Sequence, residues 1–254
     1  MDIAIIGSGN TAAVLGRKFI SAKHKIVQIV SRNASAASQL AYEWDTESAN
    51  YMSLVAKNAD VYIIAVSDNA LQEVVSDLKL PGKVVAHTAG SVSKDVLQHV
   101  SKHYGVFYPL QSLRKEIAGL PDIPIFFEGS DDKATKTLQR LAESISFEKP
   151  GLAASEDRLK LHVAAVIVNN FTNHLYVLAE RYCQSEGLDF HQLLPLIEET
   201  VKRLKTISPA AAMTGPAVRH DQDTIQKHLE LLAKHPQLQK IYRLLTESIQ
   251  ETRQ

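Results

Sequence analysis

A glycine-rich turn between an apolar strand and a helix most limits how this chain can fold. The stretch IAIIGSGNTAAVLGRKF contains a G-x-G-x-x-A pattern at Gly7, Ser8, Gly9, Asn10, Thr11 and Ala12. Glycines in such a turn let the backbone approach a pyrophosphate, and the following helix offers free N–H groups and a positive dipole end. The preceding strand and following helix are the context that the motif requires. We therefore predict a dinucleotide-binding turn; the alternative is a glycine-rich turn of another α/β fold.

Short apolar runs alternate with amphipathic segments through residues 1–150, which predicts a mostly parallel sheet covered by helices, an α/β Rossmann-like domain. The expected strands are Ile3–Ile6, Ile26–Val30, Val61–Val66, Val84–His87, Val106–Tyr108 and Ile123–Phe127. The expected helices are Asn10–Ser21, Ala34–Tyr42, Asn69–Leu78 and Lys94–Val100. The alternation stops near Pro150–Gly151, so we place a boundary there between residues 1–150 and an all-helical domain, 151–254.

Composition excludes several classes of function. The 28 basic residues balance 28 acidic ones, so no net charge attracts nucleic acid or an anionic membrane. The single cysteine excludes an intramolecular disulfide, and the ten histidines show no metal-binding spacing, so we expect no metal site. With no signal peptide before the first strand and no apolar stretch long enough for a bilayer, we expect a cytoplasmic protein without nucleic-acid or membrane partners.

The end of the second strand, VQIVSRN, indicates which dinucleotide binds. NAD-binding domains usually place Asp or Glu here for the adenosine ribose, whereas this chain has Ser31, Arg32 and Asn33. A guanidinium can grip a 2′-phosphate with paired hydrogen bonds, and a carboxylate would repel it. We therefore expect NADP (NADPH) as the cofactor. The alternative is that Arg32 is a solvated loop residue.

Two further strand ends should face the same crevice, because ligands of such sheets bind beyond the carboxyl ends of the strands. The run VYIIAVSDNAL delivers Val66, Ser67 and Asp68, with Asn69 able to cap the next helix, and VVAHTAGSVSKDVL delivers His87, Thr88, Gly90 and Ser91. We expect Val66, Ser67 and Thr88 to contact the cofactor and Ser91 the substrate. His87 could be a general acid or orient a substrate carbonyl, or it could simply cap its loop.

A long helix should begin at a capping Ser155 and end near Gly187. It is apolar around most of its circumference, so a second subunit should cover it and form a homodimer through the C-terminal helices. One stripe is polar: His162, Asn169, Asn173, Tyr176 and Glu180. These residues form an internal or dimer-interface network, or else His162, Asn169 and Asn173 close over the nicotinamide, with His162 and Asn169 catalytic and Asn173 binding substrate.

Three more helices should follow at Phe190–Thr206, Asp221–Lys234 and Pro236–Thr252. The connection SPAAAMTGPAVRHDQD gathers Thr214, Gly215, Arg219 and His220 beside a Gly-Pro turn. We expect this loop to reach the crevice, with Arg219 as a catalytic residue that holds a substrate carboxylate or cofactor phosphate, and with Thr214 and Gly215 contacting substrate. The alternative is a turn followed by a helix cap at Asp221 or Asp223.

The motifs GSGNTA, HTAGS, YPLQS, LHVAAVIVNNFTNHL and MTGPAVRHD…TIQKHLELL together resemble the Rossmann-like NADP oxidoreductases that carry a C-terminal all-helical domain of unknown function. These are relatives of pyrroline-5-carboxylate reductase, ketopantoate reductase and 6-phosphogluconate dehydrogenase. The resemblance covers essentially the whole chain. It departs at Tyr108, where the family tends to have His before Pro109, and at His220, where it tends to have Gly.

The resemblance implies hydride transfer between NADP and a small carbonyl, imine or hydroxy compound. The cofactor carries the hydride, so the protein must position the substrate and offer a proton donor. Two alternatives are a non-catalytic NADP(H)-binding or sensing module and a deazaflavin-dependent NADP oxidoreductase.

Overall fold

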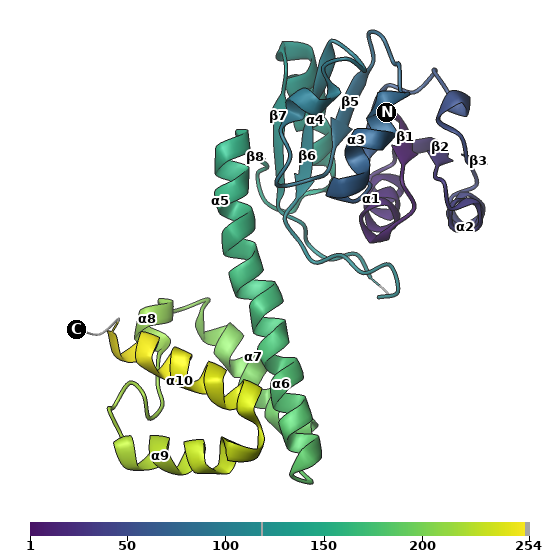
Figure 1. Ribbon diagram of the computed structural model, residues 1–254. Coiled ribbons are helices and arrows are strands. Elements are labelled where there is room, and N and C mark those ends of the chain that lie inside the picture. The colour runs from purple at the N-terminus through teal and green to yellow at the C-terminus, as the bar shows by residue number, and fades with distance from the viewer. Residues whose placement is uncertain (118, 252–254) are drawn as a thin grey trace. The chain divides into compact units, whose positions relative to one another are not determined.

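The computed structural model describes residues 1–117 and 119–251. The chain divides into two compact units, which we call the sheet unit (Met1–Asn169) and the helical unit (from Asn170 onward). An α/β Rossmann-like region therefore precedes a helical region, which confirms the fold class that the sequence predicts (Figure 1).

The sheet unit is built on one eight-stranded sheet with the order β3-β2-β1-β4-β5-β6-β7-β8 (Figure 1). The strands are β1 Asp2–Ile6, β2 Lys25–Val30, β3 Glu47–Ala49, β4 Val61–Ile64, β5 Val84–His87, β6 His103–Pro109, β7 Ile125–Gly129 and β8 Gly151–Leu152. All neighbouring strands pair in parallel except β6 and β7. The order 3-2-1-4-5-6 is that of dinucleotide-binding sheets. All six predicted strands form; β3 and β8 are additional.

Helices cover both faces of the sheet because successive side chains of each strand alternate in direction. Ile3 and Ile5 of β1 pack into the core that includes side chains of α1 (Asn10–Ser21), α2 (Ala34–Glu43) and α4 (Asp132–Ile145). Ala4 and Ile6 of the same strand point to the other face of the sheet. There they pack into a second core with side chains of α3 (Asp68–Ser76) and the 3₁₀ turn η2 (Lys94–Leu97). A further 3₁₀ turn, η1, spans Met52–Leu54.

The predicted bounds of α1 are those observed, whereas three other helix predictions need correction. Helix α4 is absent from the predicted set. The segment expected at Lys94–Val100 forms only the short turn η2. The cap of α3 is Ser67 rather than Asn69.

The long helix that the sequence predicts is interrupted in its middle. Helix α5 (Ser155–Ala165) leads into a π-helical segment, η3 (Val166–Phe171), and then into α6 (Thr172–Ser185). The cap is Ala154, and the Ser155 hydroxyl instead accepts a hydrogen bond from Arg158. A π turn closes over one more residue than an α turn. The predicted polar stripe, which assumes unbroken α-helical spacing, therefore loses its phase between His162 and Asn173.

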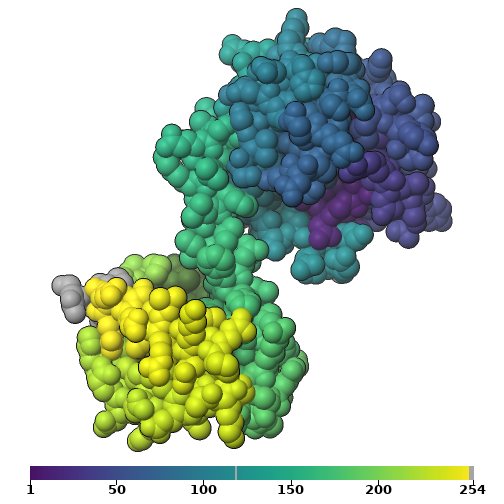
Figure 2. Space-filling model, viewed as in Figure 1, coloured from purple at the N-terminus to yellow at the C-terminus, as the bar shows by residue number. Residues whose placement is uncertain are grey.

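The helical unit continues as a series of short and medium helices packed into one body (Figure 2). They are η4 Phe190–Leu193, α7 Leu194–Arg203, α8 Pro209–Ala212, α9 Gln222–Leu231, η5 Leu232–Lys234 and α10 Pro236–Glu251. The three predicted helices form here, the first two with shorter α-helical cores, and α8 is additional. The predicted end of the third helix, Thr252, lies outside the described residues. Within the described residues, no helix has the length and apolar character to cross a membrane.

Candidate functional site

The glycine-rich turn leaves β1 and enters α1 with two glycines in different roles. Gly7 has a φ of +118°, and a Cβ there would lie 2.1 Å from the carbonyl oxygen of Ala65, so the fold itself requires glycine. A Cβ at Gly9 would meet no protein atom within 4 Å. Gly9 also begins α1 without a side-chain cap, and the first turn holds no acid. An open, uncapped helix N-terminus of this kind fits a dinucleotide pyrophosphate.

A cavity of about 300 Å³, the first cavity, opens beside this turn. Among its lining residues are the predicted cofactor contacts Gly7, Ser8, Gly9, Ser31, Arg32, Asn33, Val66 and Ser67. The hydroxyls of Ser8 and Ser31 lie 2.8 Å apart and link the turn to the end of β2. Arg32 is exposed and forms a 2.6 Å ion pair with Glu73. The predicted NADP-selecting segment therefore lines the same cavity as the glycine turn.

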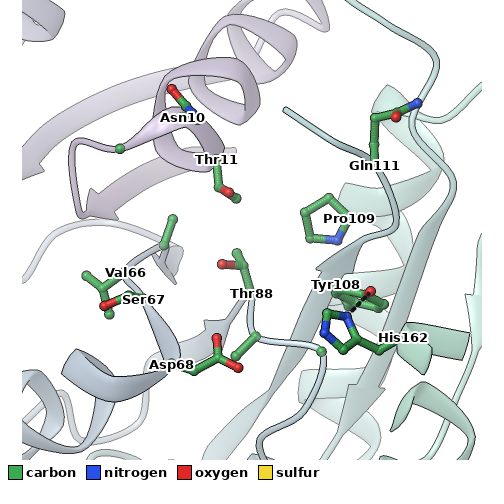
Figure 3. Close-up of a pocket in the computed structure, with 14 residues that line it drawn as sticks. Asn10, Thr11, Val66, Ser67, Asp68, Thr88, Tyr108, Pro109, Gln111 and His162 are labelled. Atoms are coloured by element: carbon green, nitrogen blue, oxygen red, sulfur yellow. Dashed lines mark hydrogen bonds between the residues drawn. The ribbon is translucent and has the colours of Figure 1, made fainter. Parts of the chain in front are cut away.

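A second cavity, of about 390 Å³, adjoins the first and shares Gly9, Ala65, Val66 and Ser67 with it. Its remaining lining residues include Asn10 and Thr11 of α1, Thr88 after β5, Tyr108 and Pro109 of β6, and His162 of α5 (Figure 3). The carboxyl ends of β1, β4 and β5 thus open onto a space next to the first cavity. Such a place suits a substrate beside a nicotinamide ring.

Tyr108 and His162 meet at the wall of the second cavity. The Tyr108 hydroxyl lies 3.1 Å from His162 Nδ1 (Figure 3). Burial, and then the nearby charge of Asp68, raise the pKa of Tyr108 above its ordinary value, with Arg158 acting in the opposite direction. The hydroxyl therefore stays protonated at neutral pH and can donate a hydrogen bond. The phenol ring lies against Gly90, where a Cβ would come within 2.8 Å of it.

His87 is fully buried and both of its ring nitrogens serve the loop that follows β5. Nδ1 accepts from the N–H of Ala89 at 3.2 Å, so Nε2 carries the proton and donates to the Ser93 carbonyl at 3.2 Å. Burial lowers the pKa of His87 to about 4. A neutral ring with both nitrogens occupied favours the loop-capping alternative over the role of proton donor.

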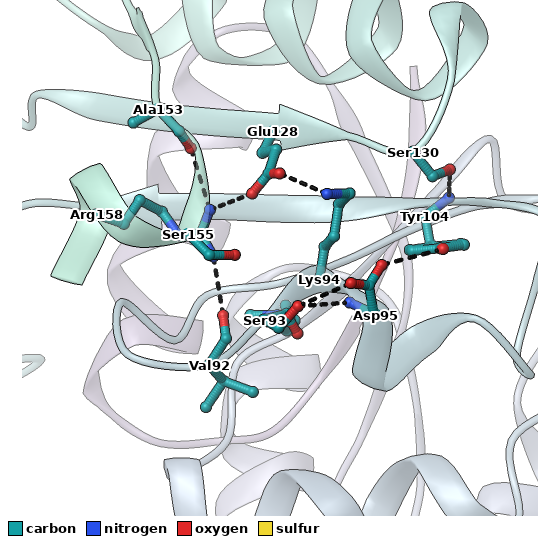
Figure 4. Close-up of polar contacts among 11 residues, drawn as sticks. Val92, Ser93, Lys94, Asp95, Tyr104, Glu128, Ser130, Ala153, Ser155 and Arg158 are labelled. Carbon is teal, nitrogen blue, oxygen red and sulfur yellow. Dashed lines mark hydrogen bonds and ion pairs between the residues drawn. The ribbon is translucent and has the colours of Figure 1, made fainter.

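A buried arginine fixes the helix that carries His162. Arg158 is fully buried, and its guanidinium donates to Glu128 of β7 and to the carbonyls of Val92 and Ala153 (Figure 4). Lys94 also bonds to Glu128, at 2.5 Å. Burial alone would raise the pKa of Glu128, but the bonds from Lys94 and Arg158 outweigh it and lower the pKa. Because His162 follows Arg158 by one turn of α5, this cluster holds it near Tyr108.

The other predicted site residues have different surroundings. Ser91 donates to Asp68 at 2.5 Å. Asn169 is exposed in the π segment, and Asn173, Thr214, Gly215 and Arg219 belong to the helical unit. Asp221 caps α9, as one alternative expected, by accepting from the Thr224 N–H. Their roles at the site stay predictions. His220 has a φ of +53°, a conformation that glycine adopts without steric cost.

Three residues with polar side chains that line the second cavity, Asp68, Tyr108 and Gln111, were not predicted as site residues. Asp68 follows β4, at a strand end that the sequence analysis already assigns to the crevice, and this position could have predicted it as a site residue. For Tyr108, the sequence indicated only that the residue differs from the one expected from the family resemblance. No group of three or more His, Cys, Asp or Glu side chains suited to a metal occurs among the described residues.

Comparison with family models gives two matches. Residues 2–90 match "NADP oxidoreductase coenzyme F420-dependent", and residues 123–249 match "Domain of unknown function (DUF2520)". The crystal structure of a "putative NADP oxidoreductase" from Bacteroides fragilis is 37% identical, with 98% of each chain covered and a TM-score of 0.88. The chain belongs to this family. This result confirms the resemblance to NADP oxidoreductases that the sequence motifs indicate.

More distant structures share the fold of the family. A reductive aminase from Aspergillus terreus in complex with NADPH and ethyl-5-oxohexanoate is 14% identical, with 97% of this chain and 92% of that chain covered and a TM-score of 0.72. A 1-pyrroline-5-carboxylate reductase from Streptococcus pyogenes is also 14% identical, with 99% and 98% covered and a TM-score of 0.62. A comparison with curated proteins finds no match.

The buried His87 predicts a specific dependence of stability on pH. Its folded pKa, about 4, lies below the ordinary value of 6.5, so the unfolded chain binds more protons between these values. The contribution of His87 is complete above pH 6.5 and is lost as the pH falls toward 4. Between about pH 7 and pH 5, we expect the free energy of unfolding to fall by about 2 kcal/mol less in His87→Gln than in the native protein.

Urea unfolding followed by the fluorescence of Trp44, the single tryptophan and a buried residue of the sheet unit, measures this difference. The exposed His99 provides the control, because His99→Gln should leave the pH dependence close to that of the native protein. An unchanged pH dependence in His87→Gln would show that the ring is not held neutral by burial.

Proposed function

We propose that this chain transfers hydride between NADP and a small carbonyl, imine or hydroxy compound bound in the second cavity. The observation that carries the proposal is the Tyr108–His162 pair in a cavity continuous with the glycine turn. Bound NADPH supplies the hydride. The protein then has to position the reacting carbon and hold a proton for the oxygen or nitrogen beside it.

The side chains of the sheet unit divide this work between them. The N-terminus of α1 and the open space at Gly9 receive the pyrophosphate, and Arg32 grips the 2′-phosphate. Val66 lines both cavities, and Thr88 lines the second. The Tyr108 hydroxyl, supported by His162, donates a hydrogen bond or a proton to the reacting heteroatom. His162 can then return a proton to Tyr108 or exchange one with solvent.

The neighbours support reduction of a C=N or C=O bond, since one is a reductive aminase bound to NADPH and another a 1-pyrroline-5-carboxylate reductase. The family description for residues 2–90 also names coenzyme F420, a deazaflavin, and this keeps a deazaflavin as a second candidate cofactor. A non-catalytic NADP(H)-binding module would keep the first cavity but would need no proton donor in the second.

Tyr108→Phe tests the proposed proton donor. The substitution keeps the ring beside Gly90 and removes only the hydroxyl, so we expect kcat to fall roughly 100-fold or more, with NADPH affinity unchanged. The measurement is NADPH oxidation, followed by absorbance, with a panel of small imines and ketones. Tyr104→Phe on the same strand is the matched control, because the Tyr104 hydroxyl bonds to Asp95 outside the cavity. Tight NADPH binding without turnover of any compound in the panel would instead favour the binding-module alternative.

Arg32 should determine the choice between NADPH and NADH. The 2′-phosphate has to displace Glu73 from Arg32, which is possible because this ion pair is exposed and therefore weak. We expect the native protein to bind NADPH more tightly than NADH. In Arg32→Ala, the difference in binding free energy between the two cofactors should shrink by roughly 1.5–3 kcal/mol. Titration of Trp44 fluorescence with each cofactor measures it. Glu73→Gln is the control and should preserve the preference; equal native affinities would contradict the assignment.

We also propose that two copies of the chain associate through the long helix. Its apolar side chains are exposed in the single chain, with Val168 71% and Phe171 60% accessible. Exposed apolar surface of this kind usually marks an interface. Light scattering at micromolar concentration should give twice the chain mass of 28.1 kDa. Phe171→Glu should shift the protein toward monomer, whereas Tyr42→Glu, at an exposed position of α2, should not. A native monomer would contradict the proposal.

A further inference from the structure

The second cavity carries an unbalanced negative charge. Asp68, in the first turn of α3, is the one Asp, Glu, Lys or Arg among the described residues that line it. The remaining lining residues are neutral, apart from the titratable ring of His162. Sites for carboxylates or phosphates usually present Arg or Lys. The described wall of this cavity has the opposite sign.

The Asp68 carboxylate is held at one oxygen and open at the other. Oδ2 accepts a 2.5 Å hydrogen bond from the Ser91 hydroxyl, and no described residue donates to Oδ1. Figure 3 shows the carboxylate beside the cavity, across from Asn10 and Thr11. Asp68 is exposed, and a carboxylate with a free oxygen can accept a hydrogen bond from a bound ligand.

The cations near this wall are engaged elsewhere. The guanidinium of Arg158 is shared among Glu128, Ser155 and two backbone carbonyls, and the ammonium of Lys94 bonds to Glu128 (Figure 4). No described residue forms an ion pair with Asp68. Its charge consequently acts on the cavity, and it reaches Tyr108, whose pKa it helps to raise after the larger effect of burial.

We propose that Asp68 selects a substrate whose reacting nitrogen is protonated, an iminium ion or the amine formed from it, over a neutral carbonyl compound. This inference rests on the proposed function. In the reaction, the imine carbon accepts the hydride of NADPH, the C=N π electrons become the nitrogen lone pair, and the amine and NADP⁺ are the products. Asp68 keeps the proton on nitrogen beforehand, and the protonated imine is the better hydride acceptor because its carbon is poorer in electrons. With this substrate, the Tyr108 hydroxyl donates to the lone pair that forms on the amine nitrogen after hydride transfer.

Binding of unreactive probes to the NADP⁺-loaded protein tests the charge preference without turnover. Pyrrolidine, a cation at neutral pH, and tetrahydrofuran, its neutral ether counterpart, have the same ring size. Calorimetry should show tighter binding of pyrrolidine, and Asp68→Asn should weaken it roughly 10- to 100-fold without affecting tetrahydrofuran. Asp68→Glu should retain part of the preference. Asp77→Asn, at an exposed position just after α3, is the control for the change in net charge.

Three results would overturn the inference. They are equal native affinities for the two rings, an unchanged pyrrolidine affinity in Asp68→Asn, and a loss of NADPH affinity in that variant in place of pyrrolidine affinity. The last result would mean that Asp68 contacts the cofactor ribose. Parallel assays with 1-pyrroline and cyclopentanone separate this inference from the proposed function. If the native enzyme reduces cyclopentanone as well as it reduces 1-pyrroline, only the charge preference fails. If neither compound is reduced, the proposed function fails and the probe binding still decides what Asp68 recognises.

Discussion

The geometry of the candidate site depends on the burial of Arg158. A guanidinium taken out of water costs several kcal/mol unless it is paired and hydrogen-bonded. Here Glu128 of β7, the loop after β5 and the residues just before α5 supply those partners. The first turn of α5 is therefore tied to two neighbouring parts of the sheet. Because α5 is a continuous helix from Arg158 to His162, the same contacts determine where the imidazole stands, and so whether Tyr108 has a partner.

Much of the sheet unit could be predicted because its signals are local. Strands such as β4 and β5 are continuous buried apolar runs, and α1 follows directly from the glycine turn, so its predicted bounds are those observed. The elements that were not predicted lack such a signal. Strand β3 has three residues, two of them exposed, and α4 begins with six residues of which one alone is apolar. The π segment contains neither glycine nor proline, so no residue in it marks the change from α-helix.

The site divides in the same way. The Gly7–Thr11 turn and the Ser31–Asn33 segment were predicted because each lies within one short stretch of sequence. Gly7, Ser8 and Gly9 line the first cavity together with Ser31–Asn33, and Asn10 and Thr11 line the second. The Tyr108–His162 contact joins residues 54 positions apart and depends on how α5 packs. Arg158 would be assigned to the surface from its residue type alone, since arginine is seldom fully buried. Long-range pairing and buried charge are therefore what sequence patterns leave undetermined here.

The contact between Gly90 and the ring of Tyr108 links two positions that lie far apart in the chain. A side chain at position 90 would come within 2.8 Å of the phenol ring, which is itself bonded to His162. Relatives with a smaller ring at position 108 gain space above position 90, and an alanine can then replace the glycine. Across the family, these two positions should therefore change together, with a bulky aromatic side chain at one accompanied by glycine at the other.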